Sequence, residues 1–161
     1  MKVIFIPKSG MPLFETLLAS ETSRDALRFY RPVQTLSGVQ ISMATMGGAL
    51  SLASDLRWYV RRYMYDVLFE LPEGVYCTRA LAKELYFSRA TILHTRWKFR
   101  RVYAMKDGQL LSDDPLPVIR GKPVPGHLRK DDDEVILEVW CTEEESYGQK
   151  TSVEESDEEE E

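Results

Sequence analysis

The sequence predicts an α+β protein with a small, mainly helical body, a few short strands and a disordered acidic C-terminal tail. Apolar residues recur at helical spacing through the middle of the chain, and short alternating runs near both ends are typical of strands. Of the 26 acidic residues, 15 follow residue 130. We therefore expect a single globular domain over residues 1–141 and a disordered acidic tail over residues 142–161.

The first third of the chain predicts a strand, a helix and a second strand. Residues 2–6, KVIFI, are typical of a buried strand. From Pro12 the leucines approximate helical spacing, with a break near residues 20–23, and Arg31-Pro32 ends the helix because proline disfavours a helical residue before it. Residues 39–43 alternate apolar and polar side chains and predict a short half-buried strand.

Residues 49–70 form the longest helical candidate. Leu52, Leu56 and Val67 lie on one apolar stripe, while the arginines of this segment lie off it. Pro72-Glu73-Gly74 ends the segment. We expect this helix to be the first member of a three-helix unit that spans residues 48–112.

Residues 78–101, TRALAKELYFSRATILHTRWKFRR, predict two short helices with a tight joint. Thr78 caps the first helix, Tyr86-Phe87 forms the joint, and Ser88 caps the second helix. This arrangement resembles a helix-turn-helix. Asp107-Gly108 between two strand-like runs predicts a hairpin at the position of a wing, so residues 78–112 resemble a winged helix. The alternatives are a helical hairpin packed in a core and a solvated basic hairpin.

The resemblance implies a DNA-binding surface. The second helix would present donors to the major groove, and the hairpin would follow the phosphate backbone. The residues expected at the groove are Arg89, Thr91, Thr95 and Arg96, and those expected at phosphates are Lys98, Arg100, Arg101 and Lys106.

Charge is divided unequally along the chain. Residues 1–130 contain 20 Lys and Arg against 11 Asp and Glu, whereas residues 131–161 contain one Lys against 15 acids. A basic body favours contact with nucleic acid, and an acidic tail favours an interaction role or screening of the body.

The last apolar run, EVILEVWC at residues 134–141, predicts a strand. Val139, Cys141 and Glu143 at its end resemble Leu-x-Cys-x-Glu, the motif by which viral transforming proteins capture retinoblastoma-family pocket proteins. The resemblance implies that these three residues bind a protein partner, with valine where leucine is usual. The alternative is that Val139 and Cys141 are core residues of the strand.

The sequence contains no recognisable set of catalytic residues. We therefore expect that the protein is not an enzyme and that it has no small-molecule substrate and no cofactor. Cys77, His94, His127 and Cys141 lack the paired spacing of a zinc site, so we expect no metal. No apolar run is long enough to cross a membrane, and two distant cysteines favour a reducing compartment. We expect an intracellular protein of the cytoplasm or nucleus.

Together these features lead to two functional hypotheses. The first is a small regulatory protein that binds DNA through its basic body, as in transcription regulation, with an acidic interaction tail. The alternative is a non-catalytic adaptor, such as a viral accessory protein, that binds host proteins and uses the tail motif.

Overall fold

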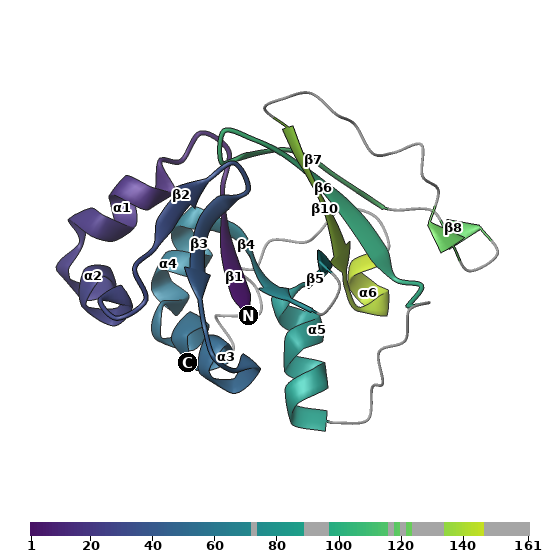
Figure 1. The fold of residues 1–161 in the computed structure, drawn as a ribbon, viewed down its shortest axis with the longest axis horizontal. Helices are drawn as coiled ribbons and strands as arrows, with labels where there is room; N and C mark the ends of the chain where they lie inside the picture. The colour runs from purple at the N-terminus through teal and green to yellow at the C-terminus, as the bar shows by residue number, and fades with distance from the viewer. Residues whose placement is uncertain (72–73, 89–96, 116–117, 120–121, 124–133, 147–161) are drawn as a thin grey trace.

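A curled eight-stranded mixed sheet organises the protein (Figure 1). The computed structural model describes residues 1–71, 74–88, 97–115, 118–119, 122–123 and 134–146. In sheet order the strands are β2 (Val33–Thr35), β3 (Gly38–Ser42), β1 (Lys2–Pro7), β4 (Met64–Glu70), β5 (Tyr76–Cys77), β10 (Glu134–Trp140), β6 (Arg100–Lys106) and β7 (Gln109–Pro115). Neighbouring strands are antiparallel except β5 and β10, which are parallel. Two short strands, β8 (Val118–Ile119) and β9 (Lys122–Pro123), pair separately.

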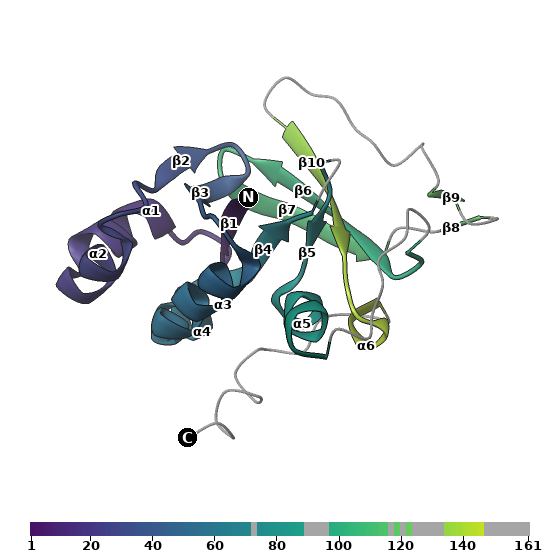
Figure 2. The ribbon, with the colours of Figure 1, turned by 60° about the horizontal axis from the view of Figure 1, so that its bottom comes forward.

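Short helices pack beside this sheet (Figures 1 and 2). Two consecutive pairs cover the half of the sheet formed by β1, β3 and β4, and the remaining helices lie near β5 and β10. They are α1 (Leu13–Ala19), α2 (Glu21–Leu27), α3 (Met46–Asp55), α4 (Arg57–Tyr63), α5 (Arg79–Lys83), which continues as the π-helical turn η2 (Glu84–Ser88), and α6 (Glu143–Ser146). Among the described helices, none combines the length and apolar character needed to span a membrane.

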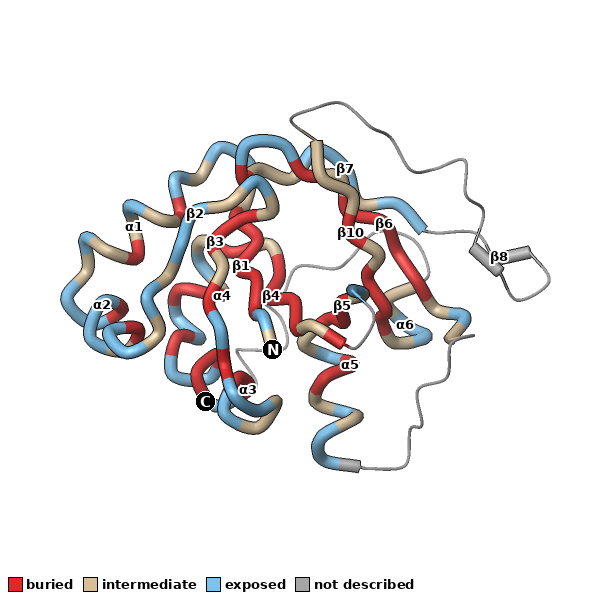
Figure 3. Tube along the Cα trace, viewed as in Figure 1, coloured by how far each residue is buried: buried red, intermediate tan, exposed pale blue. Residues whose placement is uncertain are grey.

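The central strands are buried on both faces. In β1, Val3 and Phe5 pack against the helices, while Ile4 and Ile6 face the inside of the curl and pack in a second cluster with Tyr103. Figure 3 shows this as buried backbone running through β1 and β4. Burial on both faces explains why the sequence of β1 is continuously apolar rather than alternating.

The curl brings the two ends of the sheet into contact. The Gly108 N–H donates to the Leu36 carbonyl at 3.1 Å. The side chain of Gln109 accepts from the Gly10 N–H at 3.0 Å and donates to the Met11 carbonyl at 2.9 Å. The β6–β7 turn is therefore anchored to the β2–β3 turn and to the loop before α1.

The predicted fold class, a small helical winged-helix-like body, is wrong. Residues 64–70 are the central strand β4, and the strands that begin within residues 48–112, namely β4, β5, β6 and β7, share one sheet with β1, β3 and β10. The apolar run of a strand buried on both faces can match helical spacing, and sequence periodicity does not separate the two. The helix that we extended to residue 70 ends at Tyr63.

Two further predictions are wrong in detail. Tyr86 and Phe87 do not form a joint, because the backbone remains helical through Ser88. Residues 142–146 are not disordered, because α6 forms there; the rest of the predicted tail lies outside the described residues.

Several local predictions are confirmed. Strands form at β1, β3 and β10, and the helix after Pro12 breaks at Ser20. Thr78 caps α5, with its hydroxyl accepting from the Leu81 N–H at 3.2 Å. The hairpin around Asp107-Gly108 forms as β6 and β7, and both turn residues have positive φ, 53° and 79°.

Candidate functional site

The residues that we predicted to contact DNA fall into three groups. Arg89, Thr91, Thr95 and Arg96 lie outside the described residues. Lys98 and Lys106 are exposed, whereas Arg100 and Arg101 are buried with 4% and 2% of their surface accessible. The structure therefore does not place these two arginines where a phosphate backbone could reach them.

Arg100 and Arg101 instead form ion pairs inside the fold. Arg100 lies 3.3 Å from Glu138 on β10, and its guanidinium stacks 5.0 Å from the Trp140 ring. Arg101 faces the inside of the curl, where its Nε donates to the Asp113 carboxylate at 2.5 Å. Both side chains thus join neighbouring strands of the sheet.

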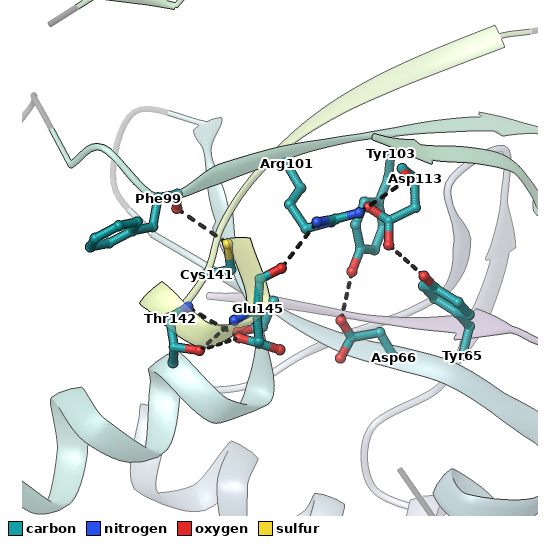
Figure 4. A network of polar contacts seen from close by, with 10 residues as sticks. Tyr65, Asp66, Phe99, Arg101, Tyr103, Asp113, Cys141, Thr142 and Glu145 are labelled. Atoms are coloured by element: carbon teal, nitrogen blue, oxygen red, sulfur yellow. Dashed lines mark hydrogen bonds and ion pairs between the residues drawn. The ribbon is translucent and has the colours of Figure 1, made fainter. Parts of the chain in front are cut away.

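Arg101 belongs to a buried polar network at one end of the inner core (Figure 4). The Tyr103 hydroxyl donates to Asp66 at 2.8 Å, and the Tyr65 hydroxyl donates to Asp113. Burial, with the charge of Asp66 next, holds the pKa of Tyr103 well above its ordinary value. Burial and the hydrogen bond to Asp113 likewise raise the pKa of Tyr65.

The hydrogen-bond donors and acceptors of this network are paired with one another. One oxygen of Asp66 accepts from Tyr103 and the other accepts from the Val67 N–H at 2.8 Å. Asp113 accepts from Tyr65 and from Arg101, which neutralises its charge. Such a satisfied network fixes the packing of β4 against β6 and β7 and has a structural role.

Glu145 extends the network to the C-terminal segment. Its carboxylate accepts from the Thr78 hydroxyl at 2.6 Å and from the Thr142 N–H at 3.1 Å, while the Thr142 hydroxyl accepts from the Glu145 N–H at 3.2 Å. The reciprocal pair is a capping box at the start of α6. Arg101 also donates to the Glu145 carbonyl at 3.0 Å. The Thr-x-x-Glu spacing is the sequence signal that could have predicted this helix start.

The residues of the proposed pocket-protein motif lie mostly in the core. Val139 and Cys141 have no accessible surface, and β10 pairs with β5 and β6 on its two sides. Glu143, by contrast, is exposed at the start of α6. Capture of this segment as an extended peptide requires β10 to leave the middle of the sheet.

A different group of side chains forms a basic surface on the solvent side of α4. Because an α-helix has about 3.6 residues per turn, Tyr59, Val60 and Tyr63 share the face that packs on the body. The opposite face carries only arginines and one tryptophan, and no acidic residue stands between positions 56 and 65. Its members are Arg57, Trp58 and Arg62, which are exposed, and Arg61, which is half-buried.

The residues that follow α2 carry a second exposed arginine-aromatic group. The Ser20 and Tyr59 hydroxyls are hydrogen-bonded at 2.5 Å, which ties the α1–α2 junction to α4. Arg28 stacks 4.5 Å from the ring of Phe29, which is 76% exposed. We refer to these two exposed groups together as the arginine-aromatic surface; it consists of Arg24, Arg28, Phe29, Arg31, Arg57, Trp58, Arg61 and Arg62.

From the sequence alone, we predicted only that the arginines of α4 lie off the apolar stripe of the helix, and we did not predict them as a binding surface. The usable signal was the pattern Arg-Trp-Tyr-Val-Arg-Arg, in which a tryptophan stands among the arginines on the polar side of the helix. A large exposed aromatic ring is more informative than an exposed charge, because tryptophan is highly buried on average.

Comparison with protein families gives one match, over residues 1–105, to a family described as a family of unknown function (DUF5804). The chain belongs to this family. Neither the curated proteins nor the solved structures contain a match to the chain. The part matched by DUF5804 includes α2 and α4, and hence the whole arginine-aromatic surface. Strands β7 and β10, which complete the sheet, lie beyond the matched part.

Proposed function

We propose that this protein binds nucleic acid through the arginine-aromatic surface. The observation that carries the proposal is the solvent face of α4, on which the exposed Arg57 and Arg62 flank Trp58 and no acidic residue of the helix stands between them. Arginine is well suited to phosphate because its planar fork donates two parallel hydrogen bonds. An aromatic ring among arginines adds a surface on which a base can stack.

The charge of the surface supports the same conclusion. Residues 24–31 and 55–63 contain six arginines and two aspartates, Asp25 and Asp55. Asp25 pairs with Arg28 at 3.4 Å, and both side chains are largely exposed, so this pair is weak in water. The surface thus retains excess positive charge for a polyanion, and binding through it weakens as salt increases.

The arginines on the solvent face of α4 are not part of the hydrophobic core. Arg57 and Arg62 are exposed, in contrast to Arg100 and Arg101, whose guanidiniums are held by acidic partners in the sheet. The burial of Arg100 and Arg101 argues against phosphate contact by these two residues, and the contact proposed here lies on helix α4.

Binding of a fluorescent RNA or DNA oligonucleotide, measured by anisotropy over a series of salt concentrations, tests the proposal. The Arg57→Ala, Arg62→Ala double variant is expected to bind more weakly and to reduce the slope of log affinity against log salt by about 2, or one per lost phosphate contact. The matched control is Lys98→Ala, Lys106→Ala, which removes the same charge at exposed positions that are not part of the arginine-aromatic surface. Equal weakening by both double variants would contradict the proposed location, and no binding by the wild type would contradict the function.

A further inference from the structure

We infer that the nucleic acid bound is unpaired, and that its bases stack on Trp58 and Phe29. This inference rests on the proposed function and specifies its ligand. It is carried by two exposed aromatic rings, each with an arginine guanidinium over it: Arg62 lies 5.2 Å from the Trp58 ring, and Arg28 lies 4.5 Å from the Phe29 ring.

Trp58 is held in one orientation while much of it remains accessible. Its ring meets Tyr59 at 5.0 Å and Tyr63 at 5.7 Å, with interplanar angles of 82° and 78°. Tyr59 is buried and hydrogen-bonded to Ser20, so the support under the tryptophan is rigid. Nevertheless 48% of Trp58 is exposed. A fixed aromatic ring with an accessible surface can stack on a base at little cost in side-chain entropy.

Phe29 offers a second ring of the same kind. It lies two residues after the end of α2 and two before Arg31, which has a positive φ of 49°. A phenylalanine this exposed has no packing role within the described residues that would account for its position. Each such ring, with its own guanidinium, can stack on a base next to a phosphate-binding group, which is how proteins hold single strands without reading their sequence.

The shape of α4 argues against a duplex ligand. A helix that reads the major groove must project into it, and its base contacts come from side chains at its tip or along one side. Helix α4 has seven residues, lies with Tyr59 and Val60 buried against the body, and runs directly into the central strand β4. In a duplex the flat faces of the bases are covered by their neighbours, so Trp58 and Phe29 could stack only on unpaired bases.

The test uses the full chain. It compares the affinity for single-stranded oligouridylate with the affinity for the duplex that oligouridylate forms with oligoadenylate of the same length. The wild type is expected to bind the single strand more tightly, and Trp58→Ala to lose about tenfold or more of that affinity while duplex binding stays unchanged. Trp58→Phe, which keeps a ring, should retain most of the affinity, and thermal unfolding of each variant shows that the fold persists.

The outcomes separate this inference from the proposed function. Equal affinity for both forms, with no effect of Trp58→Ala but a loss in the Arg57→Ala, Arg62→Ala variant, overturns the single-strand inference and keeps the proposed function. A loss of single-strand affinity in Trp58→Phe as large as that in Trp58→Ala also overturns it, because base stacking would not then explain the effect. No binding of either form overturns both.

Discussion

The Glu145 carboxylate accepts a hydrogen bond from the Thr78 hydroxyl at 2.6 Å, and this contact attaches the C-terminal segment to the start of α5. Thr78 is the N-cap of α5 and Glu145 completes the capping box of α6, so one carboxylate joins two helix starts. Residues 142–146 are therefore part of the folded body.

Glu145→Ala should lower the free energy of unfolding by about 1–2 kcal/mol, because it removes the capping box and the contact to Thr78. Chemical denaturation of the two proteins measures this difference. Glu144→Ala is the matched control, since Glu144 is exposed in the same short helix and carries the same charge. We expect the control to change stability by less than about 0.5 kcal/mol. Equal effects of the two substitutions would show that the contribution of Glu145 is only its charge.

The buried tyrosines predict a loss of stability at alkaline pH. The pKa of Tyr103 is raised in the folded state, so its contribution to stability is complete below the unfolded pKa of about 10 and is lost as pH rises above that value. The wild type should therefore unfold at lower denaturant concentrations above about pH 10 than at neutral pH. Denaturation at a series of pH values provides the measurement.

The Tyr103→Phe variant separates two contributions of the Tyr103 hydroxyl to stability, its hydrogen bond and its titration at high pH. Loss of the hydrogen bond to Asp66 should destabilise the variant by about 1–3 kcal/mol at neutral pH. The variant should then lose less stability than the wild type as pH is raised, because the group that titrates is gone. A parallel decline of both proteins would assign the alkaline transition to other groups.

Cys77 and Cys141 form no disulfide and are both buried, and burial raises the pKa of the Cys77 thiol. We expect neither Cys77 nor Cys141 to react with a thiol reagent in the native protein, because both residues are fully buried and the raised pKa of Cys77 also disfavours its reactive thiolate. Both should react at once in denaturant. Rapid labelling of the native protein would show that β5 or β10 opens readily.

Gly108 should tolerate a side chain less well than Gly10. Both have positive φ, but a Cβ on Gly10 has open space whereas one on Gly108 would lie 2.2 Å from Gln34 Nε2 and 3.2 Å from the Thr35 carbonyl. Gly10→Ala should cost about 1–2 kcal/mol for the left-handed backbone alone. Gly108→Ala should cost more, because it also displaces Gln34 from its bonds to Thr35 and Gly38. Similar melting temperatures for the two variants would show that Gln34 moves aside at little cost in stability.

The acidic residues after α6 lead to a prediction about competition. Residues 147–161 contain seven acidic residues and one lysine, opposite in charge to the arginine-aromatic surface. Removing them should raise affinity for nucleic acid at low salt, and the gain should fade as salt screens the attraction. Truncation after Ser146 leaves the Glu145 contacts intact, whereas truncation after Cys141 removes them. Unchanged affinity at low salt would show that the tail does not compete.

Local signals in the sequence predicted much of the secondary structure but not the architecture. The alternation of residues 39–43, Asp107-Gly108 and the Thr78 cap each depend on neighbouring residues, and each formed as predicted. The prediction of a helix at residues 64–70 was wrong because the burial of this segment on both faces depends on strands that are distant in the chain.

The candidate site was predicted less well than the secondary structure. Arg101 looked like a surface cation because nothing nearby in sequence reveals that β7 brings Asp113 to it across the hairpin. The pairing of α2 with α4 through Ser20 and Tyr59 is likewise a long-range contact. The exposed Trp58 could have been noticed in the sequence, but its accessibility is established only once the buried face of α4 is known.

Photo-crosslinking to oligouridylate followed by peptide mapping tests the central claim most directly, because it locates the contact without relying on a substitution. Binding through the arginine-aromatic surface predicts crosslinks at Trp58 within α4, with a second site at Phe29 after α2, and their loss in high salt. Crosslinks confined to residues 89–99, with none on α4, would contradict that location and return the contact to the segment first expected from the sequence.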